Sequence, residues 1–268
     1  MTARHLRVND IPAAMELSAE AGWNQTKEDW RALLEWDSCA CLALEIDGNL
    51  AATATLACYG NRLGWIGMVL TRESYRRRGC ARVLLEKAIE LADQQAVETL
   101  KLDATPMGEP LYTSLGFVAE QAVERWRGEG SGRGIAEGQR FAIPRALDQA
   151  LDKEGFGVDR IAMLESLARR GSVTASNSAF AMTRPGRVAT YLGPCVARGR
   201  TAAEEVIASA LKGAGPWYWD LLPDNAAAVA IATDFGFAPV RRLTRMSRGK
   251  TLRARNEMVF AIGGFVIG

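Results

Sequence analysis

One stretch in the first third of the chain changes from an apolar strand pattern to a helical pattern within about twenty residues. Apolar side chains over residues 65–70 favour a strand, and those over residues 83–91 recur at helical spacing. The basic and small residues 76–81 lie between them. Such a turn leaves backbone N–H groups unpaired at a helix N-terminus, where the helix dipole adds partial positive charge. The sequence therefore predicts a site for a phosphate or pyrophosphate, which Gly79 and Ala81 would let approach the backbone closely.

This turn forms one half of a recognisable pair of motifs. Its pattern is Arg76-x-x-Gly79-x-Ala81, and residues 111–117 read Leu-Tyr-x-x-x-Gly-Phe after a predicted strand over residues 99–103. Alone, the first pattern is equally typical of a solvated basic helix start. Both motifs in this order resemble the GNAT N-acyltransferases, in which the first motif holds the pyrophosphate of coenzyme A.

The resemblance implies acetyl-CoA as cosubstrate and assigns roles to several positions. The pyrophosphate loop comprises Arg76, Arg77, Arg78, Gly79, Cys80, Ala81 and Arg82, with Cys80 expected to point away from the thioester. The end of the fourth strand, Val69, Leu70 and Thr71, would pair with the pantetheine amides, and a backbone N–H there would polarise the thioester carbonyl. Tyr112 would act as the general acid toward the leaving thiolate. The alternative for Tyr112 is an aromatic ring that only fills the space between helix and sheet.

The general base is left open. Many enzymes of this family carry a glutamate on the fourth strand, but residues 64–70 contain no carboxylate. Asp103, at the end of the next strand, is the nearest candidate, with a cap or turn residue as the alternative reading. Asp220, beside Trp217 and Trp219 on the corresponding strand of the second half, is expected to have a structural role, with a place in a shared cleft as the alternative. A relay of ordered waters without a single base also fits.

A loop between the first two predicted helices is the candidate acceptor site. In GNAT folds this segment covers the acceptor, and here it carries Trp23, Asn24 and Gln25. A tryptophan beside two amide side chains could read an amine or a carboxylate. The alternative is ordinary packing of the tryptophan in the core or in a lid.

The order of predicted elements is a strand, two helices, three strands, the loop with its helix, a strand and a helix. The first strand is expected over residues 4–8 and the first helix from Ile11 to Ala21. A capping box at Thr26 and Asp29 predicts the second helix. Strands are expected over residues 39–46, 50–59, 62–71, 99–103, 118–127, 179–183 and 188–196, and helices over 148–151 and 159–169. The fold class is α+β, with two tandem GNAT folds that each place helices around a mixed sheet.

The second half repeats the first faintly. Leu115-Gly116-Phe117 matches Phe235-Gly236-Phe237 at an offset of 120 residues, and Ile66-Gly67 matches Leu192-Gly193 at an offset of 126. The second copy lacks the Arg-x-x-Gly-x-Ala pattern, and Ala232 replaces the tyrosine. We therefore expect an acetyl-CoA-binding domain over residues 1–127, a linker or hairpin over 128–148, and a degenerate GNAT-like domain over 149–268. The apolar residues 258–267 are expected to form a last strand.

The composition excludes several other classes of protein. Thirty-three Lys and Arg residues against 31 acidic residues give a net charge of +2, which argues against a nucleic-acid binder. No apolar run reaches membrane-spanning length. Five irregularly spaced cysteines indicate reduced thiols in a cytoplasmic protein, and with one histidine they predict no metal site.

The leading functional hypothesis is an N-acetyltransferase in which a primary amine of a small molecule or amino acid attacks acetyl-CoA directly. A protein-lysine acetyltransferase is the neighbouring alternative. A non-catalytic acyl-CoA-binding sensor, whose second half docks a partner, is the alternative from a different class. Either a monomer or a homodimer is compatible with the sequence.

Overall fold

The computed structural model describes residues 2–130 and 149–268, which form two compact units. Unit 1 comprises Met1–Ala119, Met246–Thr251 and Ile267, and unit 2 comprises Glu120–Arg245, Leu252–Val266 and Gly268. Neither unit is continuous in sequence. The expected division at residues 128–148 stays a prediction, and residues 131–148 of that expected linker lie outside the described residues.

The sheet of unit 1 contains five strands from the first half of the chain. They are β1 (Thr2–His5), β2 (Cys39–Ile46), β3 (Asn49–Tyr59), β4 (Leu63–Thr71) and β5 (Thr99–Ala104). The first four pair antiparallel in sequence order, and β5 pairs parallel to β4. The alternating residues on either side of the Asp47-Gly48 turn placed β2 correctly, whereas the first strand begins and ends two to three residues before the expected range.

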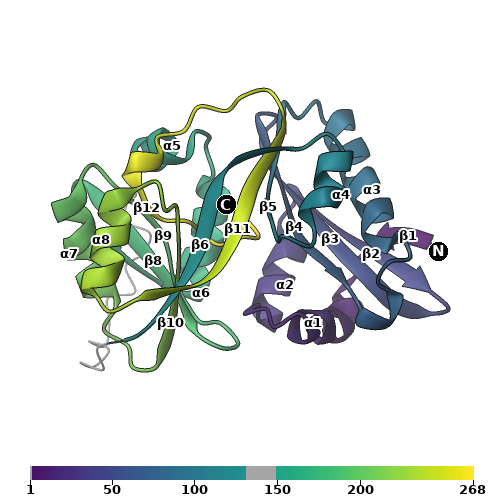
Figure 1. Ribbon diagram of the computed structural model, residues 1–268, viewed down its shortest axis with the longest axis horizontal. Helices are drawn as coiled ribbons and strands as arrows, with labels where there is room; N and C mark the ends of the chain where they lie inside the picture. Colours follow the sequence, from purple (N-terminus) through teal and green to yellow (C-terminus); the bar gives the residue numbers. More distant parts are fainter. Residues whose placement is uncertain (1, 131–148) are drawn as a thin grey trace. The chain divides into compact units, whose positions relative to one another are not determined.

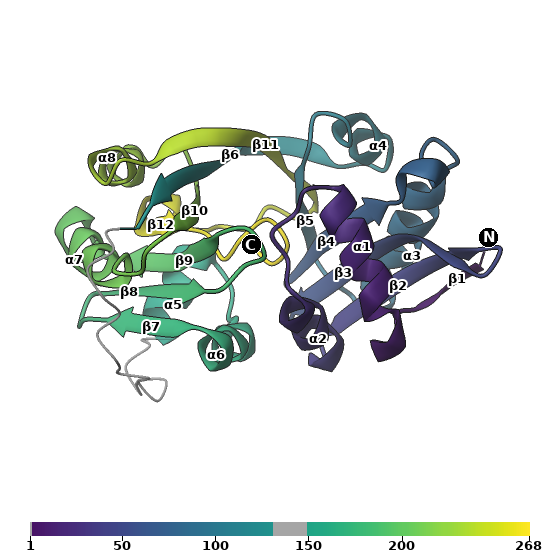
Figure 2. The ribbon, with the colours of Figure 1, turned by 90° about the horizontal axis from the view of Figure 1, so that it is seen from below.

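Helices cover both faces of this sheet. Figures 1 and 2 show α1 (Ile11–Glu20) and α2 (Lys27–Glu35) on one face, and α3 (Cys80–Gln94) and α4 (Glu109–Ser114) on the other. The predicted capping box forms, because Thr26 Oγ1 accepts from the Asp29 N–H and Asp29 accepts from the Thr26 N–H. The apolar stripe of α3, including Leu84, Leu85 and Ala88, packs on side chains of β2–β5. Short 3₁₀ turns occur at Val8–Asp10 and Glu73–Tyr75.

Unit 2 has the same kind of architecture, built mainly from the second half of the chain. Its strands are β6 (Val118–Glu129), β7 (Ser172–Ala175), β8 (Ala179–Arg184), β9 (Thr190–Ala197), β10 (Pro216–Leu221), β11 (Ala238–Gly249) and β12 (Val259–Ala261). β9 and β10 run parallel, as β4 and β5 do in unit 1. Its helices are α5 (Gln149–Phe156), α6 (Ile161–Arg170), α7 (Arg200–Ala210) and α8 (Ala226–Asp234), followed by a 3₁₀ turn at Asn256–Met258. The apolar sides of α7 and α8 pack on β8–β10, and Figure 2 shows α6 beside β7.

Two strands are exchanged between the halves of the sequence. β6 follows α4 in the chain, but from Glu120 onward it belongs to unit 2, where it pairs antiparallel with β10. The end of β11, from Met246, belongs to unit 1, where the Lys250 N–H donates to the Glu98 carbonyl and Met246 enters the core around α3. Each half of the sequence therefore gives one strand segment to the other half's unit.

The last expected strand is much shorter than predicted. Of residues 258–267, only Val259–Ala261 form a strand, β12. The expectation was wrong because the apolar run contains the Gly263-Gly264 pair, and Gly264 has a φ of +117°, in the left-handed region that favours glycine. Gly263 N–H donates to the Gly268 carbonyl, so the chain turns instead of continuing the strand.

Candidate active site

The pairing of β4 with β5 ends early. Only Gly64 and Trp65 of β4 pair with Leu100 and Lys101 of β5. Beyond Trp65, residues 66–71 of β4 have no β5 partner in the described part of the chain. This segment holds Val69, Leu70 and Thr71, the positions expected to contact pantetheine. The structure therefore leaves the β5-facing edge of β4 with backbone groups available where the resemblance requires them.

A β-bulge shapes the same segment. The β3–β4 register shifts between Thr53 and Thr55, and Met68 adopts a φ of +48°, which is rare for a residue with a side chain. Thr53 holds the bulge in place by donating its hydroxyl to the Met68 carbonyl at 2.8 Å. The roles of Thr53 and Met68 were not predicted from the sequence. The apolar pattern of residues 65–70 predicts a strand but gives no sign of a bulge, because the hydroxyl that stabilises the bulge comes from another strand.

The predicted anion loop is a helix N-terminus with several unpaired donors. The first backbone bond of α3 is from the Val83 N–H to the Gly79 carbonyl. Among the described residues, no protein group accepts from the six backbone N–H groups of residues 77–82. Six consecutive donors at the positive end of a fifteen-residue helix form a favourable environment for an anion.

Gly79 is required in this loop for its backbone conformation. Its φ is +79°, and the preceding Arg77 is also left-handed at +61°. A Cβ added to Gly79 would meet no atom within 4 Å in the protein itself. The glycine therefore serves the turn, and the space above it is free of protein atoms. This open space leaves room for the close approach of an anion that the sequence predicted at Gly79.

The side chains of the loop separate into two groups. Arg76, Arg77, Arg78 and Arg82 are exposed, with Arg78 over the Tyr75 ring and Arg82 donating to the Ser114 hydroxyl at 2.8 Å. Cys80 is buried in the core of unit 1, and its thiol lies 3.5 Å from the Tyr75 carbonyl. The cysteine is therefore a packing residue at the start of α3, while the arginines present charge at the surface.

Tyr112 lies in α4 and is 8% exposed. Its ring packs edge-on against Phe117 at 6.2 Å between centroids, and a Cβ on Gly108 would come within 2.9 Å of it. The hydroxyl has no hydrogen-bond partner among the described residues. Burial raises the pKa of Tyr112 to about 12, so the phenol keeps its proton at neutral pH and is available as a donor.

Asp103 and Asp220 occupy corresponding strands but different environments. Asp103 is half-buried near the end of β5 in unit 1. Asp220 lies on β10 in unit 2, where it accepts two hydrogen bonds from the buried Arg125 at 2.7 and 2.6 Å. This ion pair gives Asp220 the structural role that the sequence favoured. The structure places both Asp103 and Tyr112 in unit 1.

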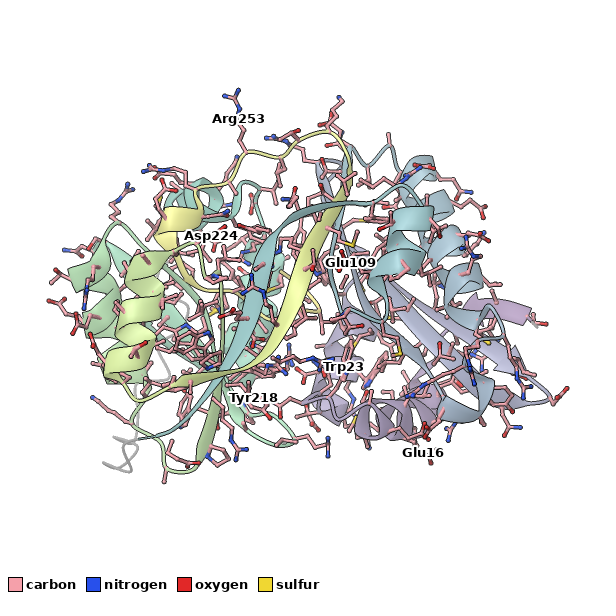
Figure 3. The ribbon with its side chains drawn as sticks, viewed as in Figure 1. Glu16, Trp23, Glu109, Tyr218, Asp224 and Arg253 are labelled. Carbon is pink, nitrogen blue, oxygen red and sulfur yellow. The ribbon has the colours of Figure 1, made fainter. Side chains whose placement is uncertain are left out.

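The Trp23 loop follows α1 directly and is partly closed. Gly22, with a φ of +68°, ends the helix, and the Trp23 N–H donates to the Ser18 carbonyl. Figure 3 labels Trp23 beside α1 and α2. Asn24 and Gln25 are buried, and Gln25 Oε1 is an enclosed acceptor without a donor in the described structure. The expected amide pair is thus present, with one oxygen unsatisfied in the protein alone.

In unit 2, β12 occupies the space between the parallel strands that corresponds to the unpaired edge of β4 in unit 1. β9 and β10 pair only from Thr190 to Leu192, and beyond this point β12 pairs with β9. The Trp219 indole N–H donates to the Phe260 carbonyl at 2.7 Å, and the Ile262 N–H donates to the Asp220 carbonyl at 2.8 Å. β12 therefore lies between β9 and β10. In the second copy, the protein's own chain takes the place that corresponds to the unpaired edge of β4.

Asn225 fixes this arrangement and was missed by sequence reasoning. Its Oδ1 accepts from the Ala228 N–H at the start of α8, and its Nδ2 lies within hydrogen-bond distance of three carbonyls, at Asn256, Glu257 and Val259. The only available signal was an asparagine before an alanine-rich helical run, which is typical of an N-cap. That signal gave no indication of the donors used against β12.

Within residues 2–130 and 149–268, no group of three or more His, Cys, Asp or Glu side chains has the arrangement of a metal site. No helix in the same ranges is both long and apolar enough to cross a membrane.

The fold, with a parallel strand pair that diverges beside a helix N-terminus, defines the class of GNAT-like acyltransferases. Residues 11–117 match the model of the acetyltransferase (GNAT) family, and residues 149–261 match that of an acetyltransferase (GNAT) domain. The chain thus belongs to the GNAT acetyltransferases as a tandem protein, and it is an acyltransferase. Proteins of this family use acetyl-CoA.

Solved structures share this fold over 92–100% of the chain. A putative acetyltransferase from Pyrococcus horikoshii is 24% identical, with a TM-score of 0.87 over 100% of this chain and 95% of that one. A tandem GNAT protein from the clavulanic acid biosynthesis pathway is 15% identical, with a TM-score of 0.63 over 92% and 98% of the two chains. A GCN5-related N-acetyltransferase from Sphaerobacter thermophilus is 14% identical, with a TM-score of 0.65 over 94% and 97%. No curated protein matches the chain.

Proposed function

We propose that unit 1 transfers an acetyl group from acetyl-CoA to the primary amine of a small molecule or amino acid. The observation that carries the proposal is the row of unpaired N–H groups at residues 77–82, next to the unpaired edge of β4. The first feature suits the pyrophosphate and the second suits the pantetheine amides, so one extended ligand could satisfy both. Arg76, Arg78 and Arg82 would add charge attraction at the surface.

The proposed reaction is direct attack. The neutral amine nitrogen forms a bond to the thioester carbonyl carbon, and a backbone N–H near Val69–Thr71 stabilises the oxyanion. The C–S bond then breaks, and the leaving sulfur accepts a hydrogen bond or proton from the Tyr112 hydroxyl. The proton lost by the amine passes to Asp103 or to ordered water. Trp23, Asn24 and Gln25 would contact the acceptor, with Gln25 Oε1 as an acceptor for its N–H groups.

Unit 2 would take no acetyl-CoA. β12 already pairs with β9. The Trp219 indole N–H donates to the Phe260 carbonyl of β12, and the Ile262 N–H after β12 donates to the Asp220 carbonyl of β10. Pantetheine could pair there only if these bonds were broken. We therefore expect one acetyl-CoA to bind per chain.

A non-catalytic acyl-CoA sensor is the second candidate. The observation that favours it is the absence of a carboxylate on β4, all of whose residues, Leu63–Thr71, are described. The availability of the Tyr112 hydroxyl favours catalysis. A protein lysine as acceptor is the third candidate, and the assay below distinguishes it from a small-molecule amine.

The test combines binding with turnover. Calorimetry should give one acetyl-CoA site per chain, and thiol release should depend on an acceptor from a panel of amines, amino acids and lysine peptides. Binding without any acceptor-dependent release would favour the sensor, and release with lysine peptides alone would move the acceptor to proteins. No binding would refute the proposal.

A matched pair of glycine variants tests the loop itself. Gly79→Glu should abolish acetyl-CoA binding, because a carboxylate would enter the anion position. Gly60→Glu is the control: Gly60 also has a positive φ, of +60°, and open space around it, but it lies in the turn at the opposite end of β4. Equal affinity in the two variants would exclude residues 77–82 as the cradle.

A further inference from the structure

Unit 2 contains a cluster of arginines that the acetyl-transfer reaction does not use. Its centre is Arg125 on β6, which is 7% exposed and bound to Asp220 through Nε and Nη2. Nη2 also donates to the Tyr191 hydroxyl at 2.9 Å. Three aromatic rings, of Tyr191, Tyr218 and Phe265, lie 4.6–5.1 Å from the guanidinium carbon. Figure 3 labels Tyr218, which comes from β10.

One terminal nitrogen of Arg125 is unused. Nη1 donates to no group among the described residues, and it is not among the enclosed polar atoms that lack a partner. This nitrogen therefore keeps some access to solvent while the rest of the guanidinium is fixed. A buried side chain held by four groups, with two N–H donors left over, is preorganised to bind an acceptor.

Arg241 supplies a second cation to this cluster. β6 and β11 are neighbours in the sheet, and Arg242 on β11 donates to Glu124 on β6 at 2.8 Å. Arg241 accordingly comes beside Arg125. It is half-buried, and it has no ion pair or hydrogen bond in the described part of the chain. Burial, followed by the charge of Arg125, lowers the pKa of Arg241.

The charges of the cluster do not balance. Arg184 also lies against Tyr191, with its guanidinium carbon 4.3 Å from the ring centroid. Arg184 donates to the Gly193 and Gly263 carbonyls, so it is engaged elsewhere. The guanidinium groups of Arg125 and Arg241 therefore share one carboxylate, Asp220, which Arg125 already engages through both oxygens. Glu124, the residue before Arg125 on β6, is paired with Arg242. A partly buried excess of positive charge is unfavourable unless an anion neutralises it.

We infer that Arg241 and the free Nη1 of Arg125 bind the carboxylate of a small organic anion against the Tyr218 ring. Guanidinium groups present N–H donors in the planar geometry that a carboxylate matches with two parallel hydrogen bonds. The aromatic walls favour an organic anion over a fully hydrated inorganic one. This site lies entirely in unit 2, so it does not rest on acetyl transfer by unit 1, and loss of acetyl-CoA binding would leave it intact.

Succinate is the probe for a direct test, with its uncharged analogue succinamide and with inorganic phosphate for comparison. Calorimetry at constant ionic strength should show saturable binding of succinate to the full-length protein, and binding of succinamide and phosphate at least tenfold weaker. Arg241→Gln should weaken succinate binding at least tenfold. Arg242→Gln should change it less than twofold, because Arg242 is the adjacent, exposed arginine already paired with Glu124.

Three outcomes would overturn the inference. These are no saturable succinate binding, equal loss in the Arg241→Gln and Arg242→Gln variants, and equal affinity for phosphate or succinamide. Arg241→Lys protects against a folding artefact, because it keeps the charge but loses the planar fork. Its succinate affinity should lie between those of the wild type and Arg241→Gln, with an unchanged circular dichroism spectrum. An affinity equal to that of the wild type would exclude bidentate binding.

Discussion

Gly193 and Ile262 approach each other so closely that no side chain fits between them. A Cβ added to Gly193 would lie 2.1 Å from the Ile262 carbonyl oxygen, and Gly193 has a φ of +139°. This contact lets the segment after β12 pass over β9 and place the Ile262 N–H on the Asp220 carbonyl. Gly193, one of the residues that match between the two halves of the sequence, therefore allows the chain after β12 to pack against β9 in unit 2.

Gly193→Ala should destabilise unit 2 strongly. The methyl group would displace the Ile262 carbonyl and add backbone strain, so we expect a loss of about 3 kcal/mol or more in the free energy of unfolding. Urea unfolding followed by tryptophan fluorescence measures it. Gly215→Ala is the control, since Gly215 also has a positive φ but open space, and it should cost about 1 kcal/mol. Similar losses in both variants would contradict the steric explanation.

Asn225→Asp should separate the two roles of Asn225. The variant keeps an acceptor for the Ala228 N–H but replaces the Nδ2 donors with an oxygen facing the three carbonyls. We expect a loss of about 2–3 kcal/mol, because buried acceptors lose their donor. Asn49→Asp, at an exposed asparagine whose Nδ2 also donates to a carbonyl, should change stability by less than about 0.5 kcal/mol. A small effect at Asn225 would mean that packing alone holds β12.

Asp152→Ala should leave a buried arginine without its carboxylate. Asp152 and Arg160 have side-chain exposures of 3% and 1% and are joined by three hydrogen bonds. Removing one partner of such a pair costs about 3–5 kcal/mol. The exposed Lys87–Glu90 pair is the comparison, and Lys87→Ala should cost less than about 0.5 kcal/mol. The Asp152→Leu, Arg160→Met double variant should recover much of the loss, and failure to do so would show that the Arg160 bond to Gly268 dominates.

Stability should fall between pH 10 and 12 because of Tyr112. Its pKa is raised to about 12 in the folded protein by burial, against about 10 in the unfolded chain. Between these values the unfolded state has lost the proton and the folded state has kept it, so the free energy of unfolding decreases as pH rises. Below pH 10 this contribution is fully present. The difference corresponds to about 2–3 kcal/mol.

The comparison variant for this pH effect is Tyr112→Phe, which removes the titrating group but keeps the ring. The curve of stability against pH should be flatter for the variant between pH 10 and 12, and subtracting the curves cancels other groups such as Cys195, whose thiol pKa burial also raises. Parallel curves would contradict the burial of the hydroxyl. In the turnover assay, the same variant should lower kcat by about 10–100-fold with little change in acetyl-CoA binding.

The sequence was sufficient for features that depend on neighbouring residues. The bounds of β2 and the capping box at Thr26 both follow from local spacing. The pair of motifs around Gly79 and Tyr112 was sufficient for the family as well. These features need no knowledge of what lies far away along the chain.

Long-range features could not be predicted in the same way. The alternating pattern of residues 118–127 predicts a strand, but it is the same whichever strand lies beside it, so the place of β6 in unit 2 was not accessible. The clustering of Arg125 with Arg241 depends on that pairing. The bulge at Met68 and the position of β12 likewise depend on contacts with Thr53 and Gly193, which are distant in sequence.

The exchanged strand segments bear on how this gene can change. A truncation that removed the second half would also remove Met246–Thr251 from the core and edge of unit 1, including the partners of Glu98 and Thr99. The second half of the sequence is thereby protected from deletion, because unit 1 would lose part of its core and sheet without it. Because each half of the sequence supplies a strand segment to the other half's unit, neither half can be lost without incomplete folding of the other.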